Sequence, residues 1–193
     1  MSTTLFDLSS RTALVTGGSK GLGKAMARAL AKAGASVAIS SRHEDELKSA
    51  AAEIGQESHA KVVPLAADMT HRGEVKGLAE RAIAALGKVD ILINNAGGNM
   101  PQPIDQITDE VWDHFVELNL SSCMALTRAL VPQMKDRKWG RVIHISSIMG
   151  FTSIPERSVT LQPKAPSWAW PARALWIWAS LASRSIASHP DPS

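Results

Sequence analysis

The sequence predicts an α/β fold: a doubly wound parallel sheet, truncated after its fifth strand, with helices on both faces. Short apolar runs of strand length alternate with longer segments of helical periodicity up to residue 145. The apolar runs are continuous rather than alternating, which is typical of parallel strands buried on both faces. A glycine-rich segment follows the first run. Right-handed crossovers between such strands place the helices on the two faces of the sheet.

Each element is expected from its local pattern. Uninterrupted apolar residues predict five strands, at 12–15, 37–40, 62–67, 91–93 and 141–145. Helical spacing and good helix formers predict four helices, at 24–33, 44–54, 74–86 and 109–134. Gly55 and Gly87 are expected to follow the ends of the second and third helices, because glycine is the commonest residue just past a helix end.

Composition narrows the class of protein. The 193 residues suit one domain, and 21 basic against 18 acidic residues leave a net charge of +3 without a basic block, so nucleic-acid binding is not expected. No apolar run is long enough to span a bilayer, and the first residues lack a signal-peptide pattern. The single Cys123 fits a reducing compartment and is interpreted as a small buried residue. We therefore expect a cytoplasmic protein without a membrane partner. The six histidines lack metal-ligand spacing, and no metal site is expected.

The glycine-rich segment, residues 16–23, lies between the first strand and the first helix. In this context glycine lets the backbone approach a pyrophosphate, while the helix N-terminus offers free N–H groups and a positive dipole end. The alternative is an ordinary glycine turn without a ligand. Under the first interpretation, the residues expected to bind a dinucleotide here are Gly17, Ser19, Lys20, Gly21, Leu22 and Gly23.

The residues after the second strand bear on the choice of dinucleotide. NAD sites usually place an acidic residue there for the ribose hydroxyls, whereas this chain has Ser41 followed by Arg42. Lys20 adds a second positive charge from the glycine segment. Two cations without a carboxylate suit a 2′-phosphate, so NADP is expected rather than NAD. The alternative is that both are solvated surface charges.

Five motifs together resemble the short-chain dehydrogenase/reductase family over about residues 8–159. They are the glycine segment, Asp68, the run Asn94–Gly97, Asn119 and Ser147, in the family's order and spacing. The sequence looks most like bacterial carbonyl reductases and sugar or polyol dehydrogenases of that family. The resemblance implies a Rossmann-like fold, hydride transfer between NADP(H) and a small carbonyl or alcohol substrate, and a homotetramer or dimer, although a truncated chain would lack much of the family's assembly surface.

The resemblance also implies a role for each residue. Asp68 and Met69 would border the adenine ring, and Asn95, Ala96 and Gly97 would support the sheet edge and the cofactor. Asn119 would anchor a proton-relay water, and Ser147 would hydrogen-bond the substrate oxygen. Each residue taken singly also has a local explanation as a helix start, a turn former, a mid-helix polar residue or a cap.

The chain departs from the family where a Tyr, three residues and a Lys are expected. The Tyr would be the general acid–base, and the Lys would lower its pKa and hold the nicotinamide ribose. This chain contains no Tyr; Thr160 stands at the expected Tyr position and Lys164 at the Lys position. An alkanol hydroxyl is too weak an acid to replace a phenol, whose pKa is about 10. A catalytically dead NADP-binding remnant is therefore the alternative function.

Composition changes at the same point. Residues 160–193 hold five of the ten Pro and four of the six Trp. We therefore predict a dinucleotide-binding domain at 1–159 and an aberrant tail at 160–193 that replaces the active-site helix and the last strands. Loss of one nucleotide in the Val159 codon explains the change, because the restored frame permits Tyr in place of Thr160 and keeps Lys164. The alternative is a naturally divergent tail.

Overall fold

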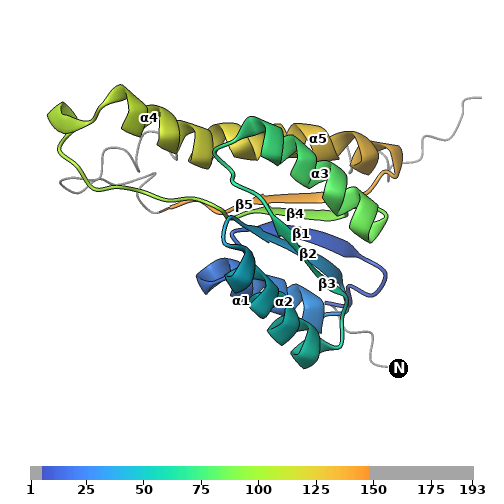
Figure 1. Cartoon of the computed structure of the whole chain (residues 1–193). Helices are drawn as coiled ribbons and strands as arrows, with labels where there is room; N and C mark the ends of the chain where they lie inside the picture. The colour runs from blue at the N-terminus through green and yellow to red at the C-terminus, as the bar shows by residue number, and fades with distance from the viewer. Residues whose placement is uncertain (1–5, 148–193) are drawn as a thin grey trace, which may run out of the picture.

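Five parallel strands form a single sheet in the computed structural model, which describes residues 6–147. The strands are β1 (Thr12–Thr16), β2 (Ser36–Ser41), β3 (Val62–Ala66), β4 (Ile91–Asn94) and β5 (Arg141–His144). Their order is β3-β2-β1-β4-β5 (Figure 1). From β1, the chain adds β2 and β3 on one side of the sheet, and then returns to add β4 and β5 on the other side of β1. The strand order switches direction between β1 and β4, and open sheets of this kind bind ligands in a crevice at the carboxyl ends of the strands beside such a switch.

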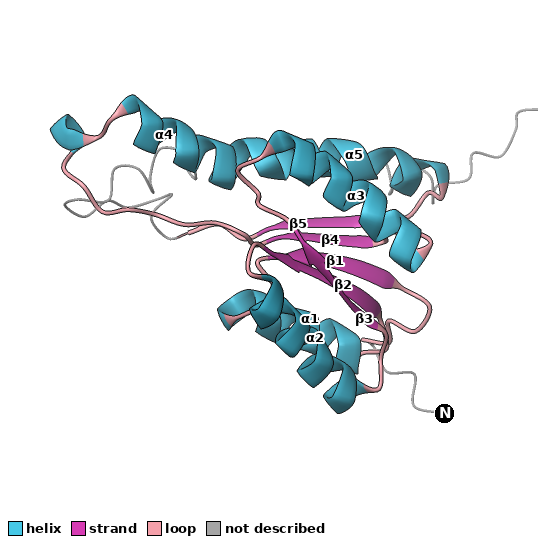
Figure 2. Ribbon diagram, in the orientation of Figure 1, coloured by secondary structure: helices cyan, strands magenta, loops and turns pink. Residues whose placement is uncertain are grey.

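Helices cover both faces of this sheet (Figure 2). Helices α1 (Gly21–Lys32) and α2 (Glu44–Ser58) lie on one face, and α3 (Arg72–Leu86), α4 (Asp109–Val116) and α5 (Ser122–Asp136) lie on the other. The side chains of β1 divide between the two cores: Ala13 and Val15 pack toward α1 and α2, and Leu14 packs toward α3 and α5. The predicted doubly wound α/β fold is confirmed across the described residues.

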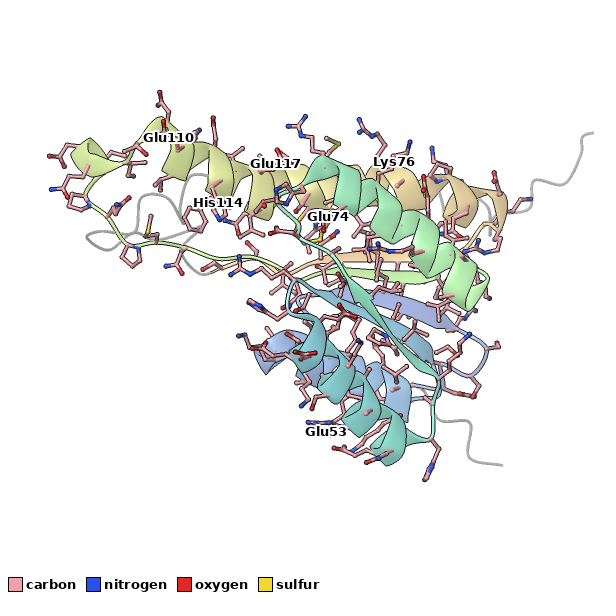
Figure 3. All side chains as sticks on the ribbon, in the orientation of Figure 1. Glu53, Glu74, Lys76, Glu110, His114 and Glu117 are labelled. Atoms are coloured by element: carbon pink, nitrogen blue, oxygen red, sulfur yellow. The ribbon has the colours of Figure 1, made fainter. Side chains whose placement is uncertain are left out.

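Helices α1 and α2 are joined across their exposed sides by ion pairs (Figure 3). Glu53 pairs with Lys24 at 2.6 Å and with Arg28. Glu57 pairs with Arg28 at 3.1 Å and with Lys32 at 3.0 Å. The pairs therefore link the helix that follows the glycine segment to the helix that follows β2.

The opposite, amino-terminal edge of the sheet is closed by a buried carboxylate. Asp90, which is 1% exposed, accepts a hydrogen bond from the Thr12 backbone N–H at 3.1 Å. It also pairs with Lys88 at 3.0 Å and Arg137 at 3.3 Å. The two cations offset the cost of burying the charge. We interpret this cluster as structural, because it lies at the end of the sheet away from the crevice.

Several predicted helix boundaries were wrong. Helix α2 continues through Gly55 to Ser58 and ends at His59, which takes the left-handed conformation with φ +56°. Residues beyond Gly55 gain contacts that offset the cost of about 1 kcal/mol for a helical glycine: the Ser58 hydroxyl donates to the Ile54 carbonyl at 2.6 Å, and Glu57 pairs with Arg28 and Lys32 of α1. Helices α1 and α3 begin at Gly21 and Arg72, three and two residues before the predicted starts. Gly87 does follow α3, with φ +79°, as predicted.

The helix predicted over 109–134 is present and extends without a break from Asp109 to Asp136, but its middle is not α-helical. A π-helical turn, Glu117–Ser121, separates α4 from α5, and α5 ends at Asp136. Such a turn inserts an extra residue into a helix and often marks a functional site. It contains Asn119, which is 5% exposed and therefore points into the molecule rather than to solvent.

Candidate dinucleotide-binding site

The loops that follow β1 and β4 are bound to each other at the crevice. The Thr16 hydroxyl accepts hydrogen bonds from the backbone N–H groups of Asn95 and Ala96, each at 3.0 Å. In return, Asn95 Nδ2 donates to the carbonyl oxygens of Thr16 at 2.9 Å and Gly17 at 3.3 Å. These four bonds hold the glycine segment against the Asn94–Gly97 turn. The Asn94–Gly97 turn thus contacts the loop after β1 through these hydrogen bonds, at the edge of the sheet that it was expected to support.

Two glycines are required by this arrangement. A Cβ at Gly23 would lie 2.1 Å from the Gly17 carbonyl oxygen, and a Cβ at Gly17 would lie 2.8 Å from Asn95 Nδ2. Gly17 also has φ +66°, a conformation that side chains disfavour. Their lack of side chains lets the first turn of α1 pack directly on the loop.

The outer side of the same segment is open. A Cβ at Gly21 would meet no atom within 4 Å, and Leu22 is 59% exposed. Lys20 occupies the N-cap position of α1 without a side-chain cap hydrogen bond, and the first-turn N–H groups have no acceptor within the helix. Open space beside unpaired amides at a positive helix end fits a pyrophosphate. The residues present therefore fit the group that the sequence predicted.

The two predicted cations lie around this opening, and each has a carboxylate near it. Arg42 is exposed directly after β2. The Lys20 ammonium lies 3.5 Å from Glu46 Oε2, with side chains 75% and 50% exposed. The carboxylate near Arg42 is that of Asp68. Burial raises the pKa of Asp68, whereas hydrogen bonds from the Thr70 backbone N–H at 2.8 Å and the Thr70 hydroxyl at 2.7 Å lower it, as do the charges of His71 and Arg42. The net result is a pKa of Asp68 below its usual value.

Asp68 and Met69 follow β3 at the same edge of the sheet. The Met69 side chain is 5% exposed and packs in the core cluster on the α3 and α5 side. Any contact of Met69 with an adenine ring would therefore involve its backbone or an edge of the side chain. Asp68 is partly exposed and is the better placed of the two to face a ligand.

Asn119 fastens the π-helical turn to the loop that follows β4. Its Oδ1 accepts a hydrogen bond from the Gly98 backbone N–H at 3.1 Å, and its Nδ2 donates to the Gly98 carbonyl at 3.0 Å. A bidentate ion pair between Arg72 and Glu117, at 3.0 and 2.9 Å, ties the same turn to the start of α3 (Figure 3). The side chain of Asn119 thus positions backbone in this structure, and its proposed work on a water remains a prediction.

Ser147 lies beyond β5 at the same carboxyl edge as the glycine segment. The Ile145 N–H donates to the Asn94 carbonyl at 2.9 Å, which aligns the ends of β5 and β4. Below this point His144 Nδ1 lies 3.4 Å from Asn94 Nδ2, and burial lowers the pKa of His144. The structure therefore brings Ser147 to the predicted edge. Thr160 and Lys164 lie outside the described residues.

Sequence reasoning missed several of these contacts. Thr16 is part of the glycine segment, but the sequence assigned it no role. Only its position directly before the glycines hints at its hydrogen bonds to Asn95 and Ala96. Glu46 and Glu117 gave no signal, since acidic residues on helices are usually solvated. The π-helical turn was also unforeseen.

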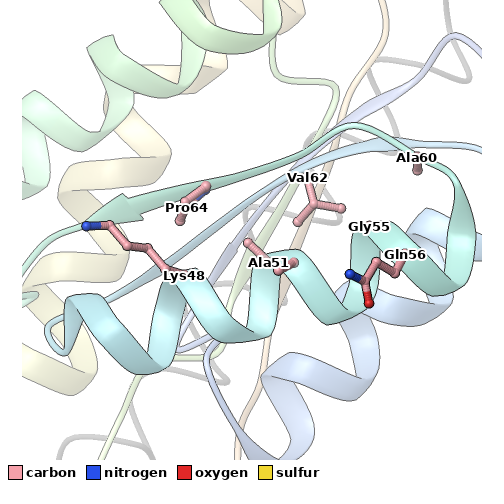
Figure 4. Close-up of a pocket in the computed structure, with 8 residues that line it drawn as sticks. Lys48, Ala51, Gly55, Gln56, Ala60, Val62 and Pro64 are labelled. Atoms are coloured by element: carbon pink, nitrogen blue, oxygen red, sulfur yellow. The ribbon is translucent and has the colours of Figure 1, made fainter.

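A shallow depression elsewhere on the surface does not belong to this site. It lies between α2 and the edge strand β3 (Figure 4). Its lining residues are Lys48, Ala51, Ala52, Gly55, Gln56, Ala60, Val62 and Pro64. Lys48, its one charged residue, is paired with Glu44 at 2.7 Å. The depression lacks convergent polar groups, so it carries no chemistry that competes with the crevice.

Residues 6–147 show neither a metal-binding cluster nor a helix suited to cross a membrane. No three His, Cys, Asp or Glu side chains in this range gather so as to hold a metal ion. Among the helices of the same range, none combines the length and apolar character that a membrane span requires.

The sequence and the fold of this chain match those of known proteins. The profile of the short chain dehydrogenase family matches residues 11–159. Nodulation protein G of Rhizobium sp. (strain N33) is 40% identical over 161 residues, covering 83% of this chain and 64% of its own length. The chain thus spans less than two thirds of that relative.

Solved structures show the same likeness. L-sorbose reductase from Gluconobacter frateurii, complexed with NADPH and L-sorbose, superimposes with a TM-score of 0.81 and 32% identity, covering 83% of this chain and 61% of that one. A 7α-hydroxysteroid dehydrogenase complexed with NADH and 7-oxoglycochenodeoxycholic acid superimposes with a TM-score of 0.86 and 30% identity. The match covers 91% of this chain and 68% of that one. With its matched profile, its parallel sheet and its paired loops at the β1–β4 switch, this chain belongs to the short-chain dehydrogenase/reductase family of nicotinamide-dependent oxidoreductases.

Proposed function

We propose that this protein binds NADP(H) in the crevice at the carboxyl ends of β1, β2 and β4. One observation carries the proposal: the glycine segment is held by Asn95 on its inner side and is open at the α1 N-terminus on its outer side. The backbone N–H groups of Gly21, Leu22 and Gly23 would hold the pyrophosphate. Lys20 and Arg42 would hold a 2′-phosphate, and Asp68 would face the adenine.

The preference for NADP over NAD rests on charge. The described end of β2 presents Ser41 and Arg42 where an NAD site would present a carboxylate. Related structures bind NADPH in one case and NADH in another, so they do not decide between the two. An arginine can hold a phosphate through two parallel hydrogen bonds, which gives the 2′-phosphate a specific partner.

The chemistry that we assign to this fold is hydride transfer between NADP(H) and a small carbonyl or alcohol substrate. The nicotinamide supplies or accepts the hydride when the cofactor is bound. Ser147 would polarise the substrate oxygen, Asn119 would hold the loop and a relay water, and Lys164 would bind the ribose. The phenol that would give the alcohol its proton is missing from this sequence, because Thr160 stands where the Tyr is expected.

We therefore propose that this chain binds the cofactor without turning over a substrate. The binding domain comprises residues 1–159, and the aberrant tail comprises residues 160–193. Absence of the general acid typically lowers a rate by about a hundred- to ten-thousand-fold. Under the frameshift hypothesis, the oxidoreductase activity would belong to a restored form of the protein that carries the Tyr. The absence of any Tyr from the sequence is the observation that favours this division.

Titration of the full chain with NADPH and NADH tests the proposal, with nucleotide fluorescence as the readout. We expect tighter binding of NADPH, reversed in favour of NADH by Arg42→Asp, and no oxidation of NADPH by carbonyl compounds. Arg128→Asp, at an exposed position on α5, is the control for net charge. Equal affinities that Arg42→Asp leaves unchanged would refute the NADP assignment, and measurable carbonyl reduction would refute the loss of turnover.

A further inference from the structure

We propose that Glu46 sets the strength of NADP-over-NAD discrimination, because its carboxylate competes with the 2′-phosphate for Lys20. This inference rests on the proposed cofactor site. It adds a residue that would weaken the preference, whereas Lys20 and Arg42 would create it.

The contact that carries the inference joins two loops across the opening of the crevice. Lys20 comes from the glycine segment after β1, and Glu46 comes from the first turn of α2, after β2. Lys20 Nζ lies 3.5 Å from Glu46 Oε2, and the two side chains are 75% and 50% exposed. A lysine so exposed has room to leave one partner for another. The ribose of a bound dinucleotide is expected between these same two loops.

The charges determine the direction of the effect. A 2′-phosphate adds negative charge beside Lys20, so it must displace Glu46 or share the ammonium with it. In either case the Glu46 carboxylate repels the phosphate at short range. NADH carries a hydroxyl at this position, which leaves the Lys20–Glu46 pair intact. Glu46 therefore weakens the binding of NADPH and leaves the binding of NADH nearly unchanged.

The neighbouring acidic residue on the same turn provides a matched control. Glu44 lies two residues earlier on α2, and its carboxylate pairs with Lys48 at 2.7 Å on the same helix. Both glutamates lie in the first turn, where a carboxylate also favours the helix dipole. Glu46→Gln and Glu44→Gln thus change the net charge and the helix dipole alike. Only Glu46→Gln frees Lys20.

The experiment measures the dissociation constants of NADPH and NADH by fluorescence titration of the full chain at low salt. Exposed ion pairs have modest strength, so we expect Glu46→Gln to raise the ratio of the NADH constant to the NADPH constant by about two- to fivefold. The change in this ratio caused by Glu44→Gln should be less than about half of the change caused by Glu46→Gln. In a Lys20→Met background, Glu46→Gln should have a smaller effect, and about 1 M salt should suppress the effect in either background.

The outcomes separate this inference from the proposed function. If the unaltered chain prefers NADPH and Arg42→Asp abolishes the preference, but the two glutamine variants behave alike, the role of Glu46 is refuted and the cofactor site stands. If the unaltered chain binds both cofactors equally, the NADP assignment fails and the role of Glu46 fails with it. An effect of Glu46→Gln that survives in the Lys20→Met background would show that competition for Lys20 is not its cause.

Discussion

Gly23 is the position where the dinucleotide loop leaves no room for a side chain. A Cβ there would lie 2.1 Å from the Gly17 carbonyl oxygen and 2.5 Å from Asn95 Nδ2. To admit a methyl group, α1 must move outward or Asn95 must release the carbonyls of Thr16 and Gly17. Overpacking costs about 1–3 kcal/mol, and each hydrogen bond lost costs about 1 kcal/mol. We therefore expect Gly23→Ala to lower the free energy of unfolding by about 3 kcal/mol.

Urea unfolding followed by circular dichroism measures this loss, and NADPH titration measures its effect on the site. The first-turn amides would shift with α1, so NADPH affinity should fall about tenfold or more, the equivalent of one charge-assisted hydrogen bond. Gly77→Ala is the control: it lies within α3 with no atom within 4 Å of an added Cβ, and we expect it to raise stability by up to about 1 kcal/mol. A Gly23→Ala protein with the parent's stability and NADPH affinity would refute this account of the loop.

Three further predictions follow from the same site. Thr16→Val should cost about 2 kcal/mol in urea unfolding, because the N–H groups of Asn95 and Ala96 lose their acceptor, and Thr16→Ser should restore most of it; a neutral Thr16→Val would contradict the bridge. Because the pKa of Asp68 is lowered on folding, its carboxylate stabilises the folded state above the unfolded pKa of about 3.9, and this stabilisation is lost as the pH falls through the folded pKa. The difference in free energy of unfolding between the parent and Asp68→Asn should therefore be constant near neutral pH and shrink below about pH 4. Restoring one base at the Val159 codon should yield a longer protein with Tyr in place of Thr160 that reduces small carbonyl compounds with NADPH, whereas Thr160→Tyr alone should stay inactive; an early stop codon in the restored frame, or full activity of Thr160→Tyr, would refute the frameshift hypothesis.

The strands and the glycine segment were predictable because a single local cause dominates each. Leu14 and its neighbours are apolar without interruption, and burial on both faces of a parallel sheet requires that pattern. Gly17 and Gly23 were recognisable because their spacing between a strand and a helix has a steric cause, which the structure confirms.

The contacts between loops were not predictable, because they depend on residues that are distant in sequence. Thr16 meets Asn95 only because β4 returns beside β1, and Lys20 meets Glu46 only because α2 packs beside α1. The end of α2 at His59 was missed because Gly55 has a plausible local role as a terminator, whereas the contacts of Glu57 with α1 are distant in sequence. Local patterns thus predicted where the site lies, but not which side chains hold it together.

Hydrogen exchange of the full chain with and without NADPH tests the central claim most directly, because it reports where the cofactor binds rather than whether activity follows. We expect NADPH to slow exchange in peptides that cover residues 17–23, 40–42 and 94–98, with NADH protecting 40–42 less. Protection confined to the depression between α2 and β3, or no protection of residues 17–23, would contradict the assignment of this crevice as the dinucleotide site.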